Sequence, residues 1–472
     1  MSKPRLIILV LVALITSNAL WHRYKPLPEG LAMHDGPLPA HNLALLVDDT
    51  WENPNGERGI RQQIFSEMFR LIRQAQKLVV VDMFLFNDFQ GTATSSHRPL
   101  ARELTDVLLA KRQQQVPVIL VTDPINTLYG GLPSEHLEQL EKAGVTVVMT
   151  PLGTLRDSNP SWSGLWRLCC QWLGNDDDGG WLPNPMGPGK ITLRSYLALP
   201  NFKANHRKTL VVDEGNDWTA MVTSANPHDG SSGHSNIALR FSGSSVGAVV
   251  QSELKIAELA NVALPPRPAI QPIPATHTEA SLEVLTEAAI RDALLETVAR
   301  SEASDTLDVA VFYLSHRPLV EALKAAHDRG VQVRVLLDPN KDAFGRQKNG
   351  IPNRPVGAEL HKAGITVRWC NTQGEQCHSK MLMRQGKTQA ELILGSANFT
   401  RRNLDNLNLE TSVRLVTPAN HPVMREASQT FLRRWENRHG EKHSMNYEAY
   451  ADEVAWKKVL YRVMEFSGWS SF

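Results

Sequence analysis

One pattern of polar residues occurs twice in the 472-residue chain, and this repeat constrains the fold more than any other feature. Residues 206–226 contain a His-x-Lys segment followed by Ser-Ala-Asn, and residues 378–398 contain the same two segments. Each polar position in the second copy lies 172 residues after its counterpart in the first. The matched pairs are His206 and His378, Lys208 and Lys380, Ser224 and Ser396, and Asn226 and Asn398. Because such a register rarely arises by chance, we expect two halves that share one fold.

Matching strand and helix patterns precede these segments. Residues 79–87 and 307–315 are apolar runs of strand length, rich in β-branched and aromatic residues. Each is followed by His-Arg-Pro-Leu, which opens an amphipathic helical pattern, and then by a second apolar run that ends in Asp-Pro. Alternating strands and helices predict an α/β fold. We expect two repeated lobes, each a mostly parallel or mixed sheet flanked by helices, with the functional site between them.

Composition places the boundaries of these lobes. A proline-rich stretch resists both helix and sheet and therefore predicts a linker between them. The expected units are an apolar terminal segment at 1–25, a first lobe at 40–263, the linker at 264–279, a second lobe at 280–440 and an amphipathic tail at 441–472. The first lobe also carries an insert at about 151–200, since far more residues precede its His-x-Lys segment than precede the second one.

The N-terminal segment is apolar with two basic residues on each side. The sixteen residues from Leu6 to Trp21 carry no charge, and as a helix they span about 24 Å, less than the roughly 30 Å hydrocarbon core of a bilayer. The segment fits a signal peptide or a membrane anchor, with a buried core helix as the third alternative. We expect the chain to be membrane-attached or exported, with the lobes on the extracytoplasmic side.

The insert and the tail have residues typical of a membrane interface. The insert contains four of the eleven tryptophans, Trp162, Trp166, Trp172 and Trp181. Tryptophan is enriched where apolar and aqueous phases meet, which predicts a lid or an interfacial segment; the alternative is a folded excursion whose tryptophans pack on the lobe. Residues 454–466 show a helical apolar pattern with basic residues between, which fits either a helix on a membrane surface or one packed on the second lobe.

The repeated motifs, over about residues 79–434, resemble those of the phospholipase D superfamily. The resemblance implies a metal-independent phosphodiesterase or phosphatidyltransferase, of the phospholipase D or cardiolipin synthase type, that needs no cofactor. It also implies a phosphohistidine at His206 and a general acid and base at His378, although chemistry alone does not fix this order. The transition state of phosphoryl transfer spreads negative charge over oxygens, which suits the cations and donors present. Lys208 and Lys380 would neutralise the phosphate, Asn226 and Asn398 would donate hydrogen bonds, and Ser224 and Ser396 would donate or hold the loop.

Two positions depart from the family pattern. Asp213, which the resemblance makes a support of the first motif, has Gln385 at the matching position of the second. Glu410 matches a carboxylate that orients a histidine, but the position 172 residues earlier is Ala238. The first half therefore seems to need another partner for its histidine, for which Asp229 is the candidate.

Charge and cysteine content limit the alternatives. The net charge of +1 disfavours a nucleic-acid partner, which usually requires a basic surface. A phospholipid substrate at a membrane surface is thus favoured, with a membrane-anchored nuclease and a non-catalytic lipid-binding protein with one degenerate half as alternatives. The nuclease alternative needs a basic groove, for which the candidates are Lys203, Arg207, Arg401 and Arg402. A monomer suffices, since both halves of the site lie in one chain. Cys370 and Cys377 are either paired or free.

Overall fold

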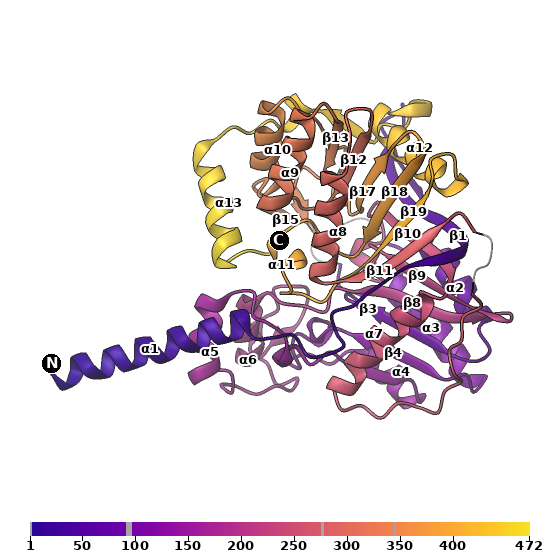
Figure 1. Ribbon diagram of the computed structural model, residues 1–472. Helices are drawn as coiled ribbons and strands as arrows, with labels where there is room; N and C mark the ends of the chain where they lie inside the picture. The colour runs from indigo at the N-terminus through magenta and orange to yellow at the C-terminus, as the bar shows by residue number, and fades with distance from the viewer. Residues whose placement is uncertain (1, 91–96, 275–277, 344–345) are drawn as a thin grey trace.

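A single mixed sheet of sixteen strands runs through both halves of the molecule and is flanked by helices (Figure 1). The computed structural model describes residues 2–90, 97–274, 278–343 and 346–472. The α/β class and the mixed sheet are as predicted from the sequence.

The two lobes have the same strand order. The first lobe has β5 (Thr146–Met149), β4 (Val118–Thr122), β3 (Val79–Met83), β8 (Lys208–Glu214), β9 (Asp217–Thr223) and β10 (Asn236–Gly243), listed across the sheet. The second has β16 (Thr366–Cys370), β13 (Gln332–Leu337), β12 (Thr306–Val311), β17 (Lys380–Gln385), β18 (Gln389–Gly395) and β19 (Thr411–Pro418). In each lobe the first three strands are parallel and the others antiparallel, because the strands that follow the His-x-Lys segments form hairpins.

A long N-terminal strand joins the two lobes. β1 (His34–Glu52) pairs through its first residues with β11 (Ser281–Thr286) of the second lobe. Its later residues pair with β10 of the first lobe, so one strand belongs to both halves of the sheet. Near its end it also pairs with β2 (Arg58–Arg61).

Helices cover the sheet and bury one apolar face each. In α2 (Ile64–Gln74), for example, Ile64, Met68 and Ile72 recur at helical spacing and are fully buried. The other helices of the first lobe are α3 (Leu100–Gln113), α4 (Glu135–Lys142) and α7 (Val246–Leu259). Those of the second are α8 (Ala288–Ala299), α9 (Arg317–Asp328), α10 (Asn353–Lys362), the short α11 (Arg401–Leu404) and α12 (Pro422–Glu436). Besides one core in each lobe, a third core contains residues of both lobes and so holds them together.

The proline-rich segment between the lobes packs along the surface. Residues 264–274 form no helix or strand, and Leu264 and Ile270 lie against the shared core. The backbone N–H of Ile273 donates to Asp217 (2.9 Å). Residues 275–277 of the predicted linker lie outside the described residues.

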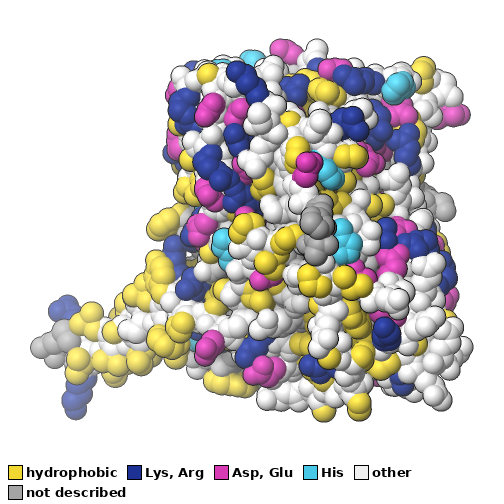
Figure 2. Space-filling model, turned by 45° about the vertical axis from the view of Figure 1, so that its right-hand side comes forward, with side chains coloured by type: hydrophobic (Ala, Val, Ile, Leu, Met, Phe, Trp, Pro, Cys, Tyr) yellow, Lys and Arg dark blue, Asp and Glu magenta, His cyan; other side chains and the backbone are white. Residues whose placement is uncertain are grey.

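The first helix projects from the body (Figure 1). α1 (Lys3–Tyr24) has 22 residues, and none of its described side chains is buried, so the alternative of a buried core helix is wrong. At 1.5 Å per residue it is about 33 Å long, enough to cross a bilayer. Figure 2 shows hydrophobic side chains along it. Its mean hydropathy of 1.8 is that of a membrane span or a signal sequence.

The insert packs against the base of α1. Its helix α5 (Pro160–Cys169) crosses α1 at Gly164, where an added Cβ would lie 2.8 Å from that of Ala19, so the close approach requires glycine. Asn18 Nδ2 donates to the Gly164 carbonyl (2.8 Å). The rest of the insert includes β6 (Leu182–Pro183), β7 (Lys190–Ile191) and α6 (Leu193–Ala198). Two of its tryptophans, Trp172 and Trp181, are 65% exposed, whereas the other two are half-buried.

The tail forms β20 (Ser444–Asn446), which pairs with β16, and α13 (Ala455–Ser467). The predicted helix is present, and it packs on the second lobe with one side only. Tyr461 and Glu465 are buried there. The remaining short elements are β14 (Asp342–Ala343), β15 (Arg346–Gln347) and the 3-10 turns at Pro124–Thr127, Leu152–Thr154, Leu199–Asn201, Asp229–Ser231, Arg438–Gly440 and Tyr447–Tyr450.

Candidate active site

Each His-x-Lys segment is held by the backbone of the opposite lobe. The N–H of His206 donates to the carbonyl of Leu409 in the second lobe (2.8 Å). The N–H of His378 donates in the same way to the carbonyl of Ser235 in the first lobe (2.8 Å). Isolated bridges, Asn205 with Leu409 and Ser235 with Cys377, repeat this arrangement. The two segments therefore meet at the junction of the lobes in a pseudo-twofold arrangement.

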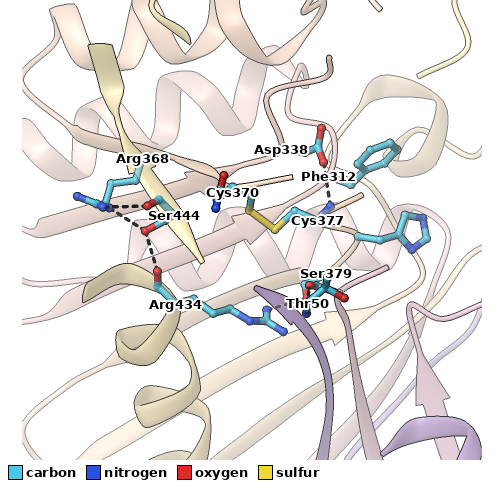
Figure 3. Close-up of a disulfide and its surroundings, with 12 residues drawn as sticks. Thr50, Phe312, Asp338, Arg368, Cys370, Cys377, Ser379, Arg434 and Ser444 are labelled. Atoms are coloured by element: carbon cyan, nitrogen blue, oxygen red, sulfur yellow. Dashed lines mark hydrogen bonds between the residues drawn. A yellow bond between two sulfur atoms is a disulfide. The ribbon is translucent and has the colours of Figure 1, made fainter. Parts of the chain in front are cut away.

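A buried aspartate fixes the residue before each histidine. Asp123 Oδ2 accepts from the N–H of Asn205 (2.7 Å), and Asp338 Oδ2 accepts from the N–H of Cys377 (2.8 Å; Figure 3). These aspartates end the two strands β4 and β13, at the Asp-Pro pairs that match in the sequence. Sequence reasoning noted the pairs but assigned them no role in the site.

The two lysines lie beneath the histidine backbones. Lys208 Nζ donates to the carbonyl of His206 (2.6 Å), and Lys380 Nζ donates to that of His378 (2.7 Å). The ammonium groups also face aromatic rings at matching positions, Lys208 at 4.9 Å from the centre of Phe84 and Lys380 at 5.4 Å from that of Phe312. Burial lowers the pKa of Lys208 to about 7. Burial and the charge of Lys208 hold the pKa of Lys380 well below its ordinary value.

The imidazole of His206 is paired with a carboxylate of the other lobe. Its Nδ1 lies 3.0 Å from Glu410, which also accepts from the Ser396 hydroxyl. Burial alone would raise the pKa of Glu410, but His206 and Lys208 hold that pKa below its ordinary value, so the group is a carboxylate. Burial lowers the pKa of His206 to about 4 although Glu410 raises it, so the ring is neutral at pH 7. Nδ1–H then donates to Glu410, and Nε2 keeps its lone pair.

The imidazole of His378 is paired with an amide instead. Its Nδ1 lies 3.0 Å from Asn236 Oδ1, which also accepts from the Ser224 hydroxyl (3.0 Å). The Asn236 amide nitrogen donates to the carbonyl of His234 (3.2 Å), which turns its oxygen toward His378. Nδ1 of His378 is therefore a donor as well. Burial lowers the pKa of His378 well below its ordinary value, and Lys380, Lys208 and His206 add to this effect.

The expected pairing of Glu410 with Ala238 is wrong. Ser396 accepts from the N–H of Thr411, and Ser224 accepts from the N–H of Ile237, so Glu410 corresponds to Asn236. The loop after the Ser-x-Asn segment is two residues shorter in the first lobe, and the constant offset of 172 fails there. Nor does Asp229 replace the carboxylate: it accepts from the N–H of Ala101 at the start of α3 (3.0 Å).

The remaining predicted residues divide between the site and the scaffold. Asn226 and Asn398 follow β9 and β18 and are 5% and 7% exposed, close to the values of 8% and 7% for His206 and His378. The serines hold the partners of the histidines, as described above. Asp213, by contrast, lies at the far end of β8 and accepts from the backbone N–H groups of residues 76–78, so it supports the sheet and not the site. Gln385 binds the carbonyl of Ala419 (3.3 Å).

The basic residues proposed for a nucleic-acid groove are used elsewhere. Lys203 is buried and pairs with Asp157 (2.7 Å). Arg207 is fully buried and pairs with Glu287 (2.8 Å). Arg402 is buried and donates to the carbonyl of Ser470, and Arg401 is half-buried near Glu465. These four side chains therefore do not form an exposed basic groove.

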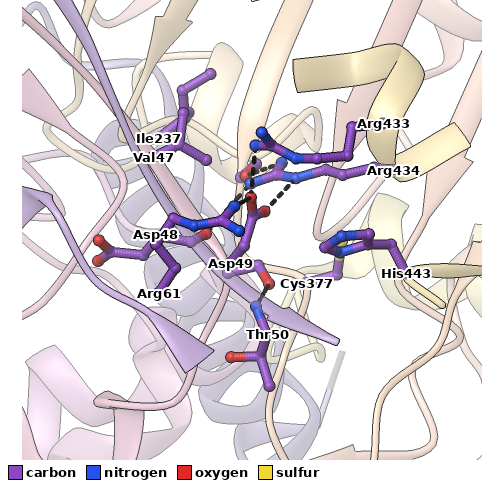
Figure 4. A network of polar contacts seen from close by, with 12 residues as sticks. Val47, Asp48, Asp49, Thr50, Arg61, Ile237, Cys377, Arg433, Arg434 and His443 are labelled. Atoms are coloured by element: carbon purple, nitrogen blue, oxygen red, sulfur yellow. Dashed lines mark hydrogen bonds and ion pairs between the residues drawn. The ribbon is translucent and has the colours of Figure 1, made fainter. Parts of the chain in front are cut away.

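A disulfide and an ion pair brace the second His-x-Lys segment. Cys370 and Cys377 are bonded, which joins β16 to the residue before His378 (Figure 3). Arg434 of α12 pairs with Asp49 of β1 (2.7 Å; Figure 4) and donates to the Ser379 hydroxyl (2.9 Å). One guanidinium thus connects β1 to the residue between His378 and Lys380. A second disulfide, Cys169–Cys170, was not expected.

Comparison with known proteins places these features in one family. Residues 298–435 match the family model described as cardiolipin synthase, PLD-like domain. Two curated relatives, each named mitochondrial cardiolipin hydrolase, are 31% identical over 138 residues (Danio rerio) and 33% identical over 143 residues (Mus musculus). The matches cover 28% and 30% of this chain, and the chain spans about half of each relative, 52% and 54%.

A solved structure supports the fold. Phosphatidylserine synthase of Haemophilus influenzae superposes with a TM-score of 0.52 at 11% identity, over 86% of this chain and 91% of that one. At this identity the likeness concerns the fold alone. The matched domain in the second lobe, the same motifs in the first and the shared architecture lead to one conclusion: the chain belongs to the phospholipase D superfamily.

Proposed function

We propose that the protein is a phospholipase D-type phosphodiesterase that acts on phospholipids through one site built from both lobes. The observation that carries this proposal is the reciprocal pairing of the two histidine segments, each held by the backbone and by a side chain of the opposite lobe. Two imidazoles and two buried ammonium groups meet there. The family membership and the relatives named as cardiolipin hydrolases support a phosphodiester substrate.

In the proposed reaction His206 is the nucleophile. Its Nε2 attacks phosphorus, the bond to the leaving alkoxide breaks, and a phosphohistidine forms. The ring becomes positively charged in this step, and the Glu410 carboxylate at Nδ1 stabilises that charge. Lys208, Lys380, Asn226 and Asn398 stabilise the negative charge on the phosphoryl oxygens without a metal ion.

His378 moves the protons. The bound diester is an anion, which favours the protonated form of His378, and His378 then gives its proton to the leaving alkoxide. In the second step the neutral ring takes a proton from water or an alcohol, whose oxygen attacks phosphorus and releases His206. Water yields phosphatidic acid. Phosphatidylglycerol as the alcohol yields cardiolipin, and the two outcomes differ only in the acceptor.

A phospholipid substrate is favoured over nucleic acid. α1 has the length and composition of a membrane anchor, which would hold the site beside a bilayer. The basic residues that a nuclease would need are buried in other contacts, as described above. Disulfides persist in oxidising compartments, so the two present favour lobes on the extracytoplasmic side.

Product analysis tests the proposal. Full-length protein is incubated with phosphatidylcholine, phosphatidylglycerol and single-stranded DNA in parallel, with excess EDTA, and products are identified by mass. We expect phosphatidic acid or cardiolipin from lipid, with activity abolished in His206→Ala and His378→Ala. His439→Ala, at an exposed histidine, is the matched control. Cleavage of DNA alone would support the nuclease alternative, and lipid binding without turnover would support the non-catalytic one.

A further inference from the structure

The outer side of α13 is an apolar stripe that the protein leaves uncovered. Trp456, Val459, Val463 and Phe466 recur at helical spacing and are between 55% and 72% exposed. The opposite side of the helix already packs on the second lobe through Tyr461 and Glu465. Four large apolar side chains on one exposed helix face indicate a binding surface.

This stripe lies next to the base of α1. The guanidinium of Arg23 lies 5.6 Å from the ring centre of Phe466. Just after α13, Trp469 Nε1 donates to the Ser161 hydroxyl of the insert (2.6 Å), and its ring lies 6.3 Å from that of Trp162. The end of α13, the insert and the base of α1 therefore form one connected region.

The direction of α13 matches a bilayer crossed by α1. In Figure 1 α13 runs crosswise to α1, on the same side of the body as the projecting helix. A helix perpendicular to a membrane span lies in the plane of the membrane surface. Lys458 and Arg462, one turn apart at the border of the stripe, are exposed and complement anionic head groups. Exposed tryptophans in α13 and in the insert suit the interface between head groups and acyl chains.

We propose that the outer face of α13 docks on the bilayer that α1 crosses, as a second contact that sets the orientation of the two lobes. The exposed Trp172 and Trp181 of the insert belong to the same contact. The inference deepens the proposed function, because it rests on α1 as a membrane anchor and assigns a lipid surface as the partner of α13. A single projecting helix lets the body pivot, whereas a second contact fixes which side of the lobes faces the lipid.

Fluorescence in a membrane tests the docking directly. Full-length protein carrying Val459→Cys or Val463→Cys, labelled with an environment-sensitive dye, is reconstituted in vesicles of phosphatidylcholine and phosphatidylglycerol. Ile60→Cys is the control, since Ile60 is 56% exposed on β2, away from α13. We expect lipids with brominated acyl chains to quench the dye at 459 and 463 but not at 60. Equal behaviour at all three positions would overturn the proposal, as would a blue shift that depends on protein concentration without quenching, which would assign the face to a second copy.

Activity provides an independent readout. Val459→Glu/Val463→Glu should lower the rate on vesicle lipid by roughly tenfold, while the rate on a soluble diester stays within twofold of wild type. Equal loss on both substrates, or none on either, would contradict docking. If the protein hydrolyses no diester at all, the proposed function fails while the quenching measurement still decides the docking, so the two failures are distinguishable.

Discussion

Glu410 and Asn236 give the two histidines different chemistry. A carboxylate at Nδ1 stabilises a positive imidazole, as in a phosphohistidine, and an amide does not. His206 is therefore better suited to carry the phosphoryl group. His378, with a neutral partner, is a stronger acid when protonated and releases its proton more readily.

Removal of the carboxylate should reduce the rate of the first step. We expect Glu410→Gln, which keeps the shape of the side chain, to lower kcat by about 100-fold or more because the phosphohistidine loses its counter-charge. Circular dichroism should show an unchanged fold. Glu436→Gln, at an exposed glutamate, is the control and should retain full activity. Near wild-type kcat in Glu410→Gln would contradict the role of this carboxylate.

A carboxylate placed beside His378 should shift the pH profile. In Asn236→Asp the new charge favours the imidazolium form and raises the pKa of His378. The acid form then persists to higher pH, so the alkaline limb of the kcat profile should move upward. An unchanged limb would show that His378 is not the group that donates the proton.

Lys208 should couple anion binding to pH. Burial lowers its pKa to about 7, so the ammonium form, which attracts the phosphate, is lost as pH rises through that value. We expect affinity for an inert phosphonate monoester, whose charge is constant over this range, to fall by up to about tenfold per pH unit above pH 7. Calorimetry measures this, with Lys208→Met, which should bind weakly at every pH, as comparison. Constant affinity in the wild type would contradict the coupling.

The sequence predicted most of these residues from their register, and its error has a local cause. Eight polar residues keep the offset of 172, because the strands that carry them have equal lengths in both lobes. Asn236 was missed because two residues are absent from the loop before β10, and a fixed offset cannot register a gap. Asp123 and Asp338 were visible as matching Asp-Pro pairs, but their role depends on contacts with a segment distant in sequence.

At the scale of elements, the segment before His378 is held by both a carboxylate and a disulfide. Cys377 is bonded to Cys370 at the end of β16, and its N–H binds Asp338. The strand pattern around this segment follows from its alternating and buried apolar residues, which is why it was predicted. β1 was not predicted to serve both lobes, since its pairing with β11 depends on the relative position of the lobes.

Loss of this disulfide should weaken both stability and activity. We expect Cys370→Ser/Cys377→Ser to lower the free energy of unfolding by about 2–3 kcal/mol and to lower kcat, because the position of His378 is less restrained. Denaturant unfolding and initial rates measure the two effects. Cys169→Ser/Cys170→Ser, which removes the disulfide of the insert, should leave kcat unchanged. Equal effects of the two double variants on kcat would contradict a specific role for the bond beside His378.

At the scale of the whole molecule, activity depends on how the lobes meet. Asp49 of the first lobe pairs with Arg434 of the second, and the same guanidinium reaches Ser379 (Figure 4). Both charged groups are buried, so loss of one leaves the other poorly compensated.

Arg434→Met should therefore loosen the junction. We expect the free energy of unfolding to fall by about 3 kcal/mol and kcat to fall with it, because Ser379 lies between His378 and Lys380. Arg433→Met is the matched control: Arg433 also pairs with Asp49 but its side chain is 26% exposed, so its loss should cost less. A larger loss in Arg433→Met than in Arg434→Met would contradict this account of the junction.

One measurement tests most directly whether two histidines from two lobes act on one phosphorus atom. A phosphodiester with a p-nitrophenyl leaving group needs no acid, so His378→Ala should release about one equivalent of p-nitrophenolate per site and then stall. After an alkaline quench, mass spectrometry should locate the phosphoryl group on His206, and His206→Ala should give no burst. A burst in His206→Ala with modification elsewhere, or none in either variant while the wild type turns over, would contradict the shared site.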